Sequence, residues 1–219
     1  CGAAGRSSLT FSALPDVACK RSEYKSDGTN VNVVLFRDDE WTYRGIDGTL
    51  AKTTVTFDAK TGEILDADIE INAAFNNLTV RDATISYDLQ SIMTHEIGHM
   101  IGFAHSPDPT ATMFSSYDPG TIGIRTLSRD DVAALCDVYP PGRVAVCDPT
   151  PRGGLGDTCA AAEEDKKGCA LSSRGLPAAT SAGGGAWLVA GSLFVFAGAR
   201  RARRARVSTF FRKTRGEKR

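Results

Sequence analysis

The segment HEIGHMIGFAH, residues 95–105, decides how this 219-residue chain is interpreted. Residues four apart in a helix lie on one face, about 6 Å apart along the axis, so His95 and His99 can bind one metal ion together. Glu96 lies beside them as a candidate general base. His105 would lie about 15 Å from His95 along the axis, and on another face, if the helix continued. Gly102 allows the sharp turn that brings His105 back, because glycine adopts positive φ at little cost.

The donor set of this segment favours a catalytic zinc ion. Three histidines leave one position of a tetrahedral zinc ion open to water, whereas a structural site is closed by a fourth protein ligand. We therefore expect His95, His99 and His105 to bind one zinc ion. Glu96 would take the proton of a metal-activated water that attacks a peptide bond. The chain has only three histidines, all in this segment, so we expect no second histidine-bound zinc.

The motif and three neighbouring stretches are similar to the matrixin family of the metzincin clan. The stretches are residues 88–95 (DLQSIMTH), 111–117 (ATMFSSY) and 127–132 (LSRDDV), and the resemblance covers roughly residues 30–139. The resemblance implies an α+β, zincin-like catalytic domain with a small twisted mixed sheet, an active-site helix and a C-terminal helix. We expect the sheet to be mostly parallel, with one antiparallel edge strand.

The same resemblance implies supporting roles for individual residues. Met113 would form a hydrophobic floor beneath the zinc ion, and Tyr117 would close the primed side of the substrate site. Residues 53–58 would be the edge strand that pairs with an extended substrate. Asp130 and Asp131 would tie the last helix to the chain start and to the Met113 turn. Their alternative role is that of acids at a helix N-terminus.

Hydrophobic patterns predict the regular elements. Strands are expected at residues 31–37, 53–58 and 64–72, with a hairpin loop at 58–62, and helices at 88–100 and 130–139, the latter capped by Ser128. The third strand alternates isoleucines with acids, which indicates a half-buried strand whose acids face solvent. The alternative role of these acids, with the hairpin aspartate, is to bind calcium, and the residues concerned are Asp58, Asp66, Asp68 and Glu70.

The zero net charge conceals an uneven distribution. Residues 200–219 hold ten Lys/Arg against Glu217 alone, and residues 1–199 therefore carry sixteen basic and twenty-five acidic residues, a net charge of −9. This acidic body argues against nucleic-acid binding. We expect protein or peptide substrates and a monomeric chain.

Six cysteines, an even number, suit disulfide bonds in an exported protein. Local pairs Cys136/Cys147 and Cys159/Cys169 are plausible, but connectivity stays open at this stage. Cys19 is interpreted as a further disulfide partner. The chain begins at Cys1 without a methionine, so we expect a preceding segment to be missing or removed, with lipidation of Cys1 as the alternative.

The domain organisation follows the changes in composition. We expect an irregular N-terminal segment (1–29), the catalytic domain (30–143), a cysteine-containing linker (144–182) and an apolar segment with an arginine-rich tail (183–219). Residues 186–199 are uncharged and precede five arginines, which resembles the sorting tails of myxobacterial surface proteins. The positive-inside rule would then leave the catalytic domain outside the cell, secreted or anchored to the membrane. The alternative is a buried helix with a solvated basic end.

These observations favour a zinc-dependent endopeptidase that cleaves internal peptide bonds of extracellular proteins. Two alternatives stay open. One is a catalytically silent module that binds peptides or mediates adhesion, against which the intact Glu96 argues. The other is a processing enzyme with a single partner protein, since the loop at residues 115–127 would determine specificity.

Overall fold

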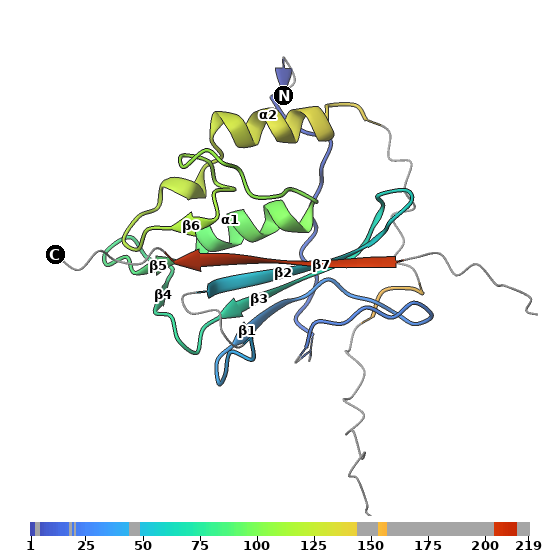
Figure 1. Cartoon of the computed structure of the whole chain (residues 1–219), viewed down its shortest axis with the longest axis horizontal. Helices are drawn as coiled ribbons and strands as arrows, with labels where there is room; N and C mark the ends of the chain where they lie inside the picture. The colour runs from blue at the N-terminus through green and yellow to red at the C-terminus, as the bar shows by residue number, and fades with distance from the viewer. Residues whose placement is uncertain are drawn as a thin grey trace, which may run out of the picture. The chain divides into compact units, whose positions relative to one another are not determined.

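The computed structural model describes residues 1–2, 5–17, 19, 21–43, 49–143, 153–156 and 204–213, the last range as backbone alone. Figure 1 shows helix α1 lying against a twisted sheet, with α2 further from the sheet. The elements are β1 (Val34–Arg37), β2 (Thr49–Asp58), β3 (Ile64–Asn72), β4 (Leu78–Thr79), β5 (Tyr87–Asp88), α1 (Leu89–Met100), β6 (Ser116–Tyr117), the 3₁₀ helix η2 (Gly123–Arg125), α2 (Arg129–Val138) and β7 (Arg204–Lys213). The predicted α+β class and both predicted helices are confirmed.

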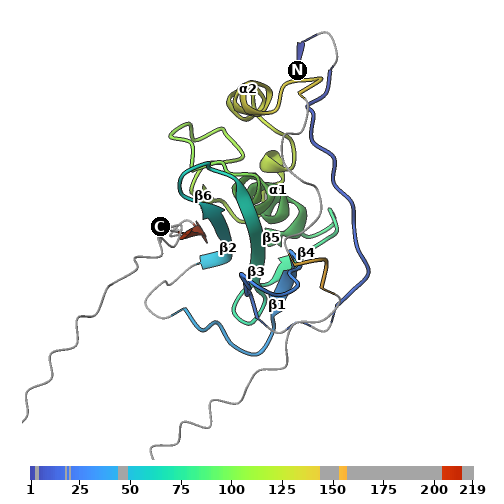
Figure 2. The same cartoon turned by 90° about the vertical axis from the view of Figure 1, so that its right-hand side faces the viewer.

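The main sheet has the strand order β1-β3-β2-β7-β6. β1 pairs with β3 and β6 with β7 in parallel, whereas β2 pairs with both β3 and β7 in antiparallel fashion. The mixed, mostly parallel sheet is confirmed for the described strands, because β1, β3, β7 and β6 run in one direction and β2 alone runs antiparallel to them. The expected edge position of β2 is wrong, because β7 pairs along β2 on the side away from β3 (Figure 2).

The hairpin between β2 and β3 forms where it was predicted. Gly62 has a φ of 74°, and its amide donates to the carbonyl of Asp58 at 2.8 Å. The Asp58 carboxylate accepts the amide hydrogens of Lys60 and Thr61 at 2.8 and 3.1 Å. These two hydrogen bonds lower the pKa of Asp58. Asp58 therefore serves the turn, which does not support a calcium site there.

The acids of β3 contradict the expectation of a solvated strand face. Asp66, Asp68 and Glu70 are at most 2% exposed, so β3 is covered on both faces. Glu70 accepts hydrogen bonds from the Arg37 guanidinium at 2.9 Å, from Lys52 Nζ at 3.2 Å and from the Tyr43 hydroxyl. Burial raises the pKa of Glu70, but these donors and charges hold it below its usual value overall. A buried carboxylate needs such partners, and they take the place of solvent around Glu70.

The hydrophobic core lies between α1 and the sheet and contains side chains from both. Six side chains form its buried centre: Leu50, Ala51, Ile69, Ile71, Ile92 and Tyr117. The apolar positions of α1 recur at helical spacing on the face that meets β2 and β3, which fixes the rotation of the helix. This rotation places the histidines relative to the sheet.

The chain start is tied to α2 by a covalent bond. Cys1 and Cys136 form a disulfide bond, and the Ser8 amide donates to the Tyr139 carbonyl at 3.0 Å. The plausible pair Cys136/Cys147 is therefore wrong, because a contact 135 residues apart is invisible to local spacing. Cys19 is disulfide-bonded, as interpreted. The pair Cys159/Cys169 lies outside the described residues.

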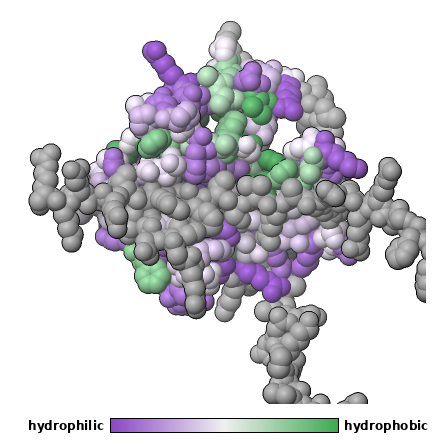
Figure 3. Space-filling view, viewed as in Figure 1, coloured by the Kyte–Doolittle hydropathy of each residue, from purple (hydrophilic) through white to green (hydrophobic). Residues whose placement is uncertain are grey.

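The described part of the chain contains no helix long and apolar enough to cross a membrane. Residues 186–199, which carried the membrane interpretation, lie outside that part. On the face shown in Figure 3, the described surface is largely polar, with apolar residues in small separate areas. The expected membrane anchor thus stays a prediction from sequence.

Candidate metal centre

The three predicted histidines come together in the structure. His95 and His99 lie one turn apart on α1, with ring centroids 4.7 Å apart. The ring of His105 lies 5.3 Å from that of His95 and 4.8 Å from that of His99. Nε2 atoms of His99 and His105 are 3.2 Å apart, and one ligand atom from each histidine falls within 4.8 Å of the others. Three nitrogens at this separation can share one metal ion.

A Schellman motif ends α1 and brings His105 to the helix. The Phe103 amide donates to the Gly98 carbonyl at 3.0 Å, and the Gly102 amide donates to the His99 carbonyl at 3.0 Å. Gly102 has a φ of 98°, which a residue with a Cβ adopts only with strain. The predicted turning role of Gly102 is therefore seen directly, since the chain reverses at this residue.

Backbone carbonyls orient two of the imidazoles. Nδ1 of His95 lies 2.6 Å from the Thr112 carbonyl, and Nδ1 of His99 lies 2.7 Å from the Phe103 carbonyl. A carbonyl can only accept, so each Nδ1 carries the proton and each Nε2 keeps its lone pair. Metal-binding histidines are usually held by this kind of hydrogen bond. The sequence gives no sign of these carbonyl partners, because they depend on the path of the chain after α1.

The buried environment keeps the histidines of α1 neutral. Burial, and after it the electrostatic interaction with His99, lowers the pKa of His95 to about 3. Burial also lowers the pKa of His99 to about 4. Neutral imidazole is the form that binds metal, so both groups are ready to bind at neutral pH without losing a proton.

Glu96 follows His95 on the helix and is fully buried. Its Oε2 accepts a hydrogen bond from the hydroxyl of Thr53 on β2, and the same hydroxyl lies 3.3 Å from the Glu96 carbonyl. Oε1 has no hydrogen-bond partner within the described residues. Burial raises the pKa of Glu96 to about 8, which makes its carboxylate a strong proton acceptor when it is ionised. Thr53 thus fixes one carboxylate oxygen of Glu96.

Met113 is buried against α1, and its predicted role as the floor beneath the zinc ion stays a prediction. It is 5% exposed, and a Cβ added to Gly98 would overlap its Sδ. The Asp131 carboxylate accepts the amides of Thr112 and Met113 at 2.8 and 3.1 Å. The expected tie between Asp131 and the Met113 turn is therefore confirmed. The need for glycine at position 98 was missed in the sequence analysis.

Asp130 has a different partner from the one expected. Its carboxylate accepts a hydrogen bond from the Ser106 hydroxyl at 2.7 Å, and the predicted tie to the chain start is not seen among the described residues. Ser106 directly follows His105, and its amide donates to the Met113 carbonyl at 2.8 Å. Asp130 therefore anchors the segment that carries the third histidine.

An ion pair missed in the sequence analysis fixes the start of α1. Asp88 caps the helix by accepting the Ser91 amide at 2.8 Å, and Arg125 of η2 donates to both its oxygens at 2.8 and 2.6 Å. Arg125 and the capping amide hold the pKa of Asp88 below its usual value, against the effect of burial. Tyr117, 2% exposed, accepts the Asp88 amide at its hydroxyl, at 3.2 Å. The loop at 115–127 is thereby attached to the active-site helix.

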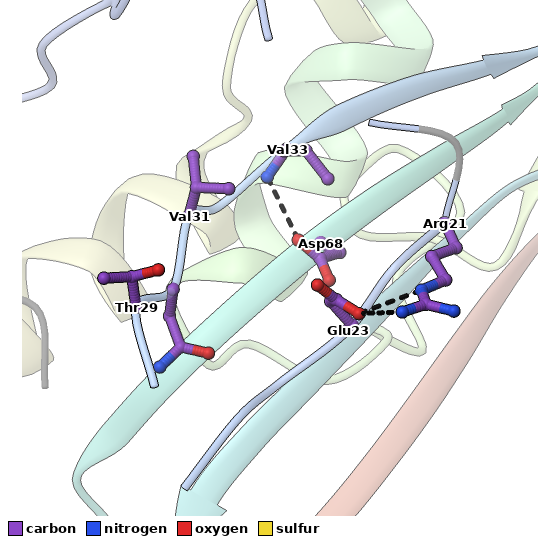
Figure 4. Close-up of a pocket in the computed structure, with 7 residues that line it drawn as sticks. Arg21, Glu23, Thr29, Val31, Val33 and Asp68 are labelled. Atoms are coloured by element: carbon purple, nitrogen blue, oxygen red, sulfur yellow. Dashed lines mark hydrogen bonds and ion pairs between the residues drawn. The ribbon is translucent and has the colours of Figure 1, made fainter. Parts of the chain in front are cut away.

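A shallow pocket elsewhere is separate from this centre (Figure 4). Its lining residues are Arg21, Glu23, Thr29, Asn30, Val31, Val33 and Asp68. Its carboxylates already have partners: Glu23 pairs with Arg21 at 2.8 Å, and Asp68 accepts the Val33 amide at 3.0 Å. The pocket includes none of the three histidines, so it does not belong to the metal centre.

The donor set fits a zinc ion. Among the described residues, the three histidines form the only group of three or more His, Cys, Asp or Glu side chains placed to bind one metal ion. The donors are neutral nitrogens, which suit zinc better than calcium. The prediction of His95, His99 and His105 as a metal-binding set is thus consistent with their placement. Within the same described residues, no calcium site is shown.

Comparison with known proteins also finds similarity to metalloproteinases. A sequence model of the matrixin family matches residues 19–140, more than half of the chain. Metalloendoproteinase 1 of Glycine max is 38% identical over 74 residues, which cover 34% of this chain and 24% of that protein. Matrix metalloproteinase-20 of Homo sapiens is 32% identical over 112 residues, covering 51% of this chain and 22% of that protein. The matched stretches thus span less than a quarter of the length of either relative.

Proposed function

Because the chain belongs to the matrixin family, we propose that it is a zinc-dependent endopeptidase acting on internal peptide bonds of proteins. The observation that carries this proposal is the convergence of three histidine nitrogens beside a buried glutamate. Three chelating nitrogens are enough to bind a metal ion, and this binding does not need a glutamate at position 96. Glu96 is buried, with one carboxylate oxygen hydrogen-bonded and the other without a hydrogen-bond partner among the described residues. Burying such a carboxylate costs free energy, which a purely structural metal site has no reason to spend, so its presence supports a catalytic role.

In the proposed mechanism, His95, His99 and His105 would hold the zinc ion through Nε2. When bound, the ion would supply a Lewis acid that polarises a peptide carbonyl and makes a water molecule more acidic. Glu96 accepts the proton of the attacking water at Oε1 and returns it to the departing amine. Thr53 holds the other oxygen and keeps the carboxylate in place during both transfers. The carbonyls of Thr112 and Phe103 keep two imidazoles oriented throughout.

The proposal extends to where the enzyme acts. Disulfide bonds at Cys1 and Cys19 suit an oxidising environment outside the cytoplasm. We therefore propose extracellular proteins as substrates. The arginine-rich tail, with the uncharged residues 186–199, supports a cell-surface location by its sequence alone.

The direct test uses the purified chain and a library of extended peptides, with cleavage sites mapped by mass spectrometry. The zinc-loaded chain should cleave internal bonds, lose activity on dialysis against a chelator and regain it with one equivalent of zinc. A chain that holds one zinc ion but cleaves no peptide would contradict the proposal and favour a peptide-binding module instead.

A further inference from the structure

The strand β7 lies in an unexpected place, directly between the two elements that flank the metal centre. It pairs with β2 on one side, from Thr49↔Arg212 to Asp58↔Arg204, and with β6 on the other, through Ser116↔Arg212 and Tyr117↔Lys213. In the described sheet, β6 is joined to β2 only through β7. Figure 1 shows β7 running along the sheet beneath α1.

Register places β7 beside the catalytic glutamate. Thr53 of β2, whose hydroxyl binds Glu96, is opposite Thr209 of β7. Cα atoms of α1, the helix that carries His95 and His99, lie within 8 Å of Cα atoms of β7. The backbone of β7 therefore passes one strand away from Thr53, the residue that binds Glu96.

The space that β7 fills has the width of one extended chain. Neighbouring strands lie about 4.8 Å apart, so β2 and β6 would stand roughly 10 Å apart without β7. Both would then present unpaired backbone groups towards the gap. An extended peptide that binds by strand addition needs such edges, and here they are already taken.

Charge favours this occupant over a neutral segment. Residues 204–213, RARVSTFFRK, carry four basic residues and no acid, whereas residues 1–199 carry a net charge of −9. The long-range field of the acidic body therefore attracts this segment. Its central VSTFF is rich in β-branched and aromatic residues, which suit a strand.

We propose that residues 204–213 are a built-in competitor, which occupies the peptide-binding edge of β2 and keeps the enzyme latent until β7 leaves. The inference rests on the proposed function, since latency has meaning only for a site that cleaves peptides. An internal strand raises the apparent dissociation constant of any extended substrate, because substrate binds only the fraction of molecules in which β7 is undocked.

The proposal also bears on the tail. If Arg200–Arg206 lay on the cytoplasmic side of a membrane, residues 204–206 could not pair with β2 outside the cell. Membrane insertion of the tail and docking of β7 therefore exclude each other in one molecule. Insertion would withdraw β7 and open the edge of β2.

The test uses the full chain with two adjacent prolines, Ser208→Pro and Thr209→Pro. Amides of successive strand residues point in opposite directions, so one of these prolines removes a donor towards β2 whichever way the alternation runs. The matched control, Ser208→Thr with Thr209→Val, changes the same positions but keeps both amides and the preference for a strand. None of these positions belongs to the metal centre.

Two measurements decide the outcome. Amide hydrogens of residues 49–58 should exchange at least tenfold faster in the proline variant than in the parent and control, and kcat/KM for an extended peptide should rise at least tenfold. Equal exchange in all chains would overturn the pairing. Faster exchange without a change in kcat/KM would overturn the latency.

A binding assay separates this inference from the proposed function. A fluorescently labelled peptide of sequence RARVSTFFRK is titrated into Glu96→Gln versions of the three chains, so that hydrolysis plays no part. We expect binding at least tenfold tighter to the proline version than to the other two, and much weaker binding of the same peptide with prolines at the positions of Ser208 and Thr209, which lacks two backbone donors. Equal or absent binding would overturn the inference. Inactivity of every chain that retains Glu96, combined with the expected binding, would overturn the proposed function and with it the latency, but would leave β7 as the occupant of the peptide-binding edge of β2.

Discussion

The metal centre and β7 are held in place by different kinds of interaction. The centre depends on individual side chains: Thr53 binds Glu96, Asp131 binds the Met113 turn, and Asp88 joins Arg125 to the start of α1. β7 is attached through backbone pairing along β2 and β6. Side-chain interactions are broken by one conservative substitution, whereas backbone pairing tolerates most substitutions except proline. The two regions can therefore be perturbed separately, and the following predictions use that difference.

The largest expected effect is that of Glu96→Gln. The amide keeps the shape of the side chain but cannot accept a proton, so kcat/KM should fall by about 10²–10⁴-fold. Zinc content should stay unchanged, because Glu96 is not a ligand. Kinetics and metal analysis of the variant check both statements, and Glu40→Gln, at an exposed position, is the matched control. Activity within tenfold of the parent would remove Glu96 from the mechanism.

The second prediction concerns the support of the Met113 turn. Asp131→Asn replaces a carboxylate that accepts the amides of Thr112, Met113 and Ser128. An amide group cannot satisfy all three, so the free energy of unfolding should fall by about 2 kcal/mol. Urea denaturation measures the change, with Asp130→Asn as the control, since Asp130 accepts only from Ser106 among the described interactions. Equal losses in the two variants would show that Asp131 has no special role.

The third prediction is a pH dependence of the zinc-free protein. The pKa of Glu96 is raised from 4.5 to about 8, so the neutral form is retained in the folded state while the unfolded chain ionises. This contribution to stability is complete below pH 4.5 and is lost as the pH rises to 8. Relative to Glu96→Gln, the parent should therefore lose roughly 1.4 kcal/mol per pH unit between about pH 5 and 8.

His95 and His99 change the stability with pH in the opposite direction. The pKa values of His95 and His99 are lowered to about 3 and 4, so their contribution is present above the unfolded pKa of 6.5 and is lost on acidification. Both chains contain these histidines, so their effect cancels in the difference between parent and variant. Urea denaturation at half-unit pH steps gives that difference, and a difference independent of pH would mean that Glu96 is not buried in a neutral form.

The smallest expected effect is that of Gly98→Ala. Replacing a glycine within a helix by alanine usually raises the stability of the helix by about 1 kcal/mol. Here the new methyl group would displace the Met113 side chain, so the gain should be absent. Thermal unfolding is the measurement, and Gly123→Ala, where a Cβ meets nothing within 4 Å, is the control that should not disturb Met113. A gain of the full 1 kcal/mol at position 98 would show that Met113 does not pack there.

Sequence reasoning succeeded where a structure is built from nearby residues. The histidine spacing, the Gly102 turn and the Ser128 cap of α2 each lie within eleven residues, and each is seen in the structure. It failed for contacts between distant residues. The Cys1–Cys136 bond, the Asp88–Arg125 pair and the burial of Glu70 by Arg37 depend on how the elements pack.

The strand β7 illustrates the limit most clearly. Its VSTFF segment has the composition of a strand, but the arginines around it were interpreted as part of a membrane tail. Which strand it pairs with cannot be read from the segment itself, because backbone hydrogen bonds carry little sequence information. The prediction of β2 as an edge strand was therefore wrong in this structure, although its antiparallel direction was right.

We expect three histidines to hold one catalytic zinc ion, and X-ray absorption on the dialysed chain identifies the ligands of that ion. Metal analysis of the same sample gives the stoichiometry. We predict one zinc ion per chain, bound by three imidazole nitrogens at about 2.0–2.1 Å and one oxygen ligand. A sulfur ligand, a fourth protein nitrogen or a second tightly held zinc ion would contradict it.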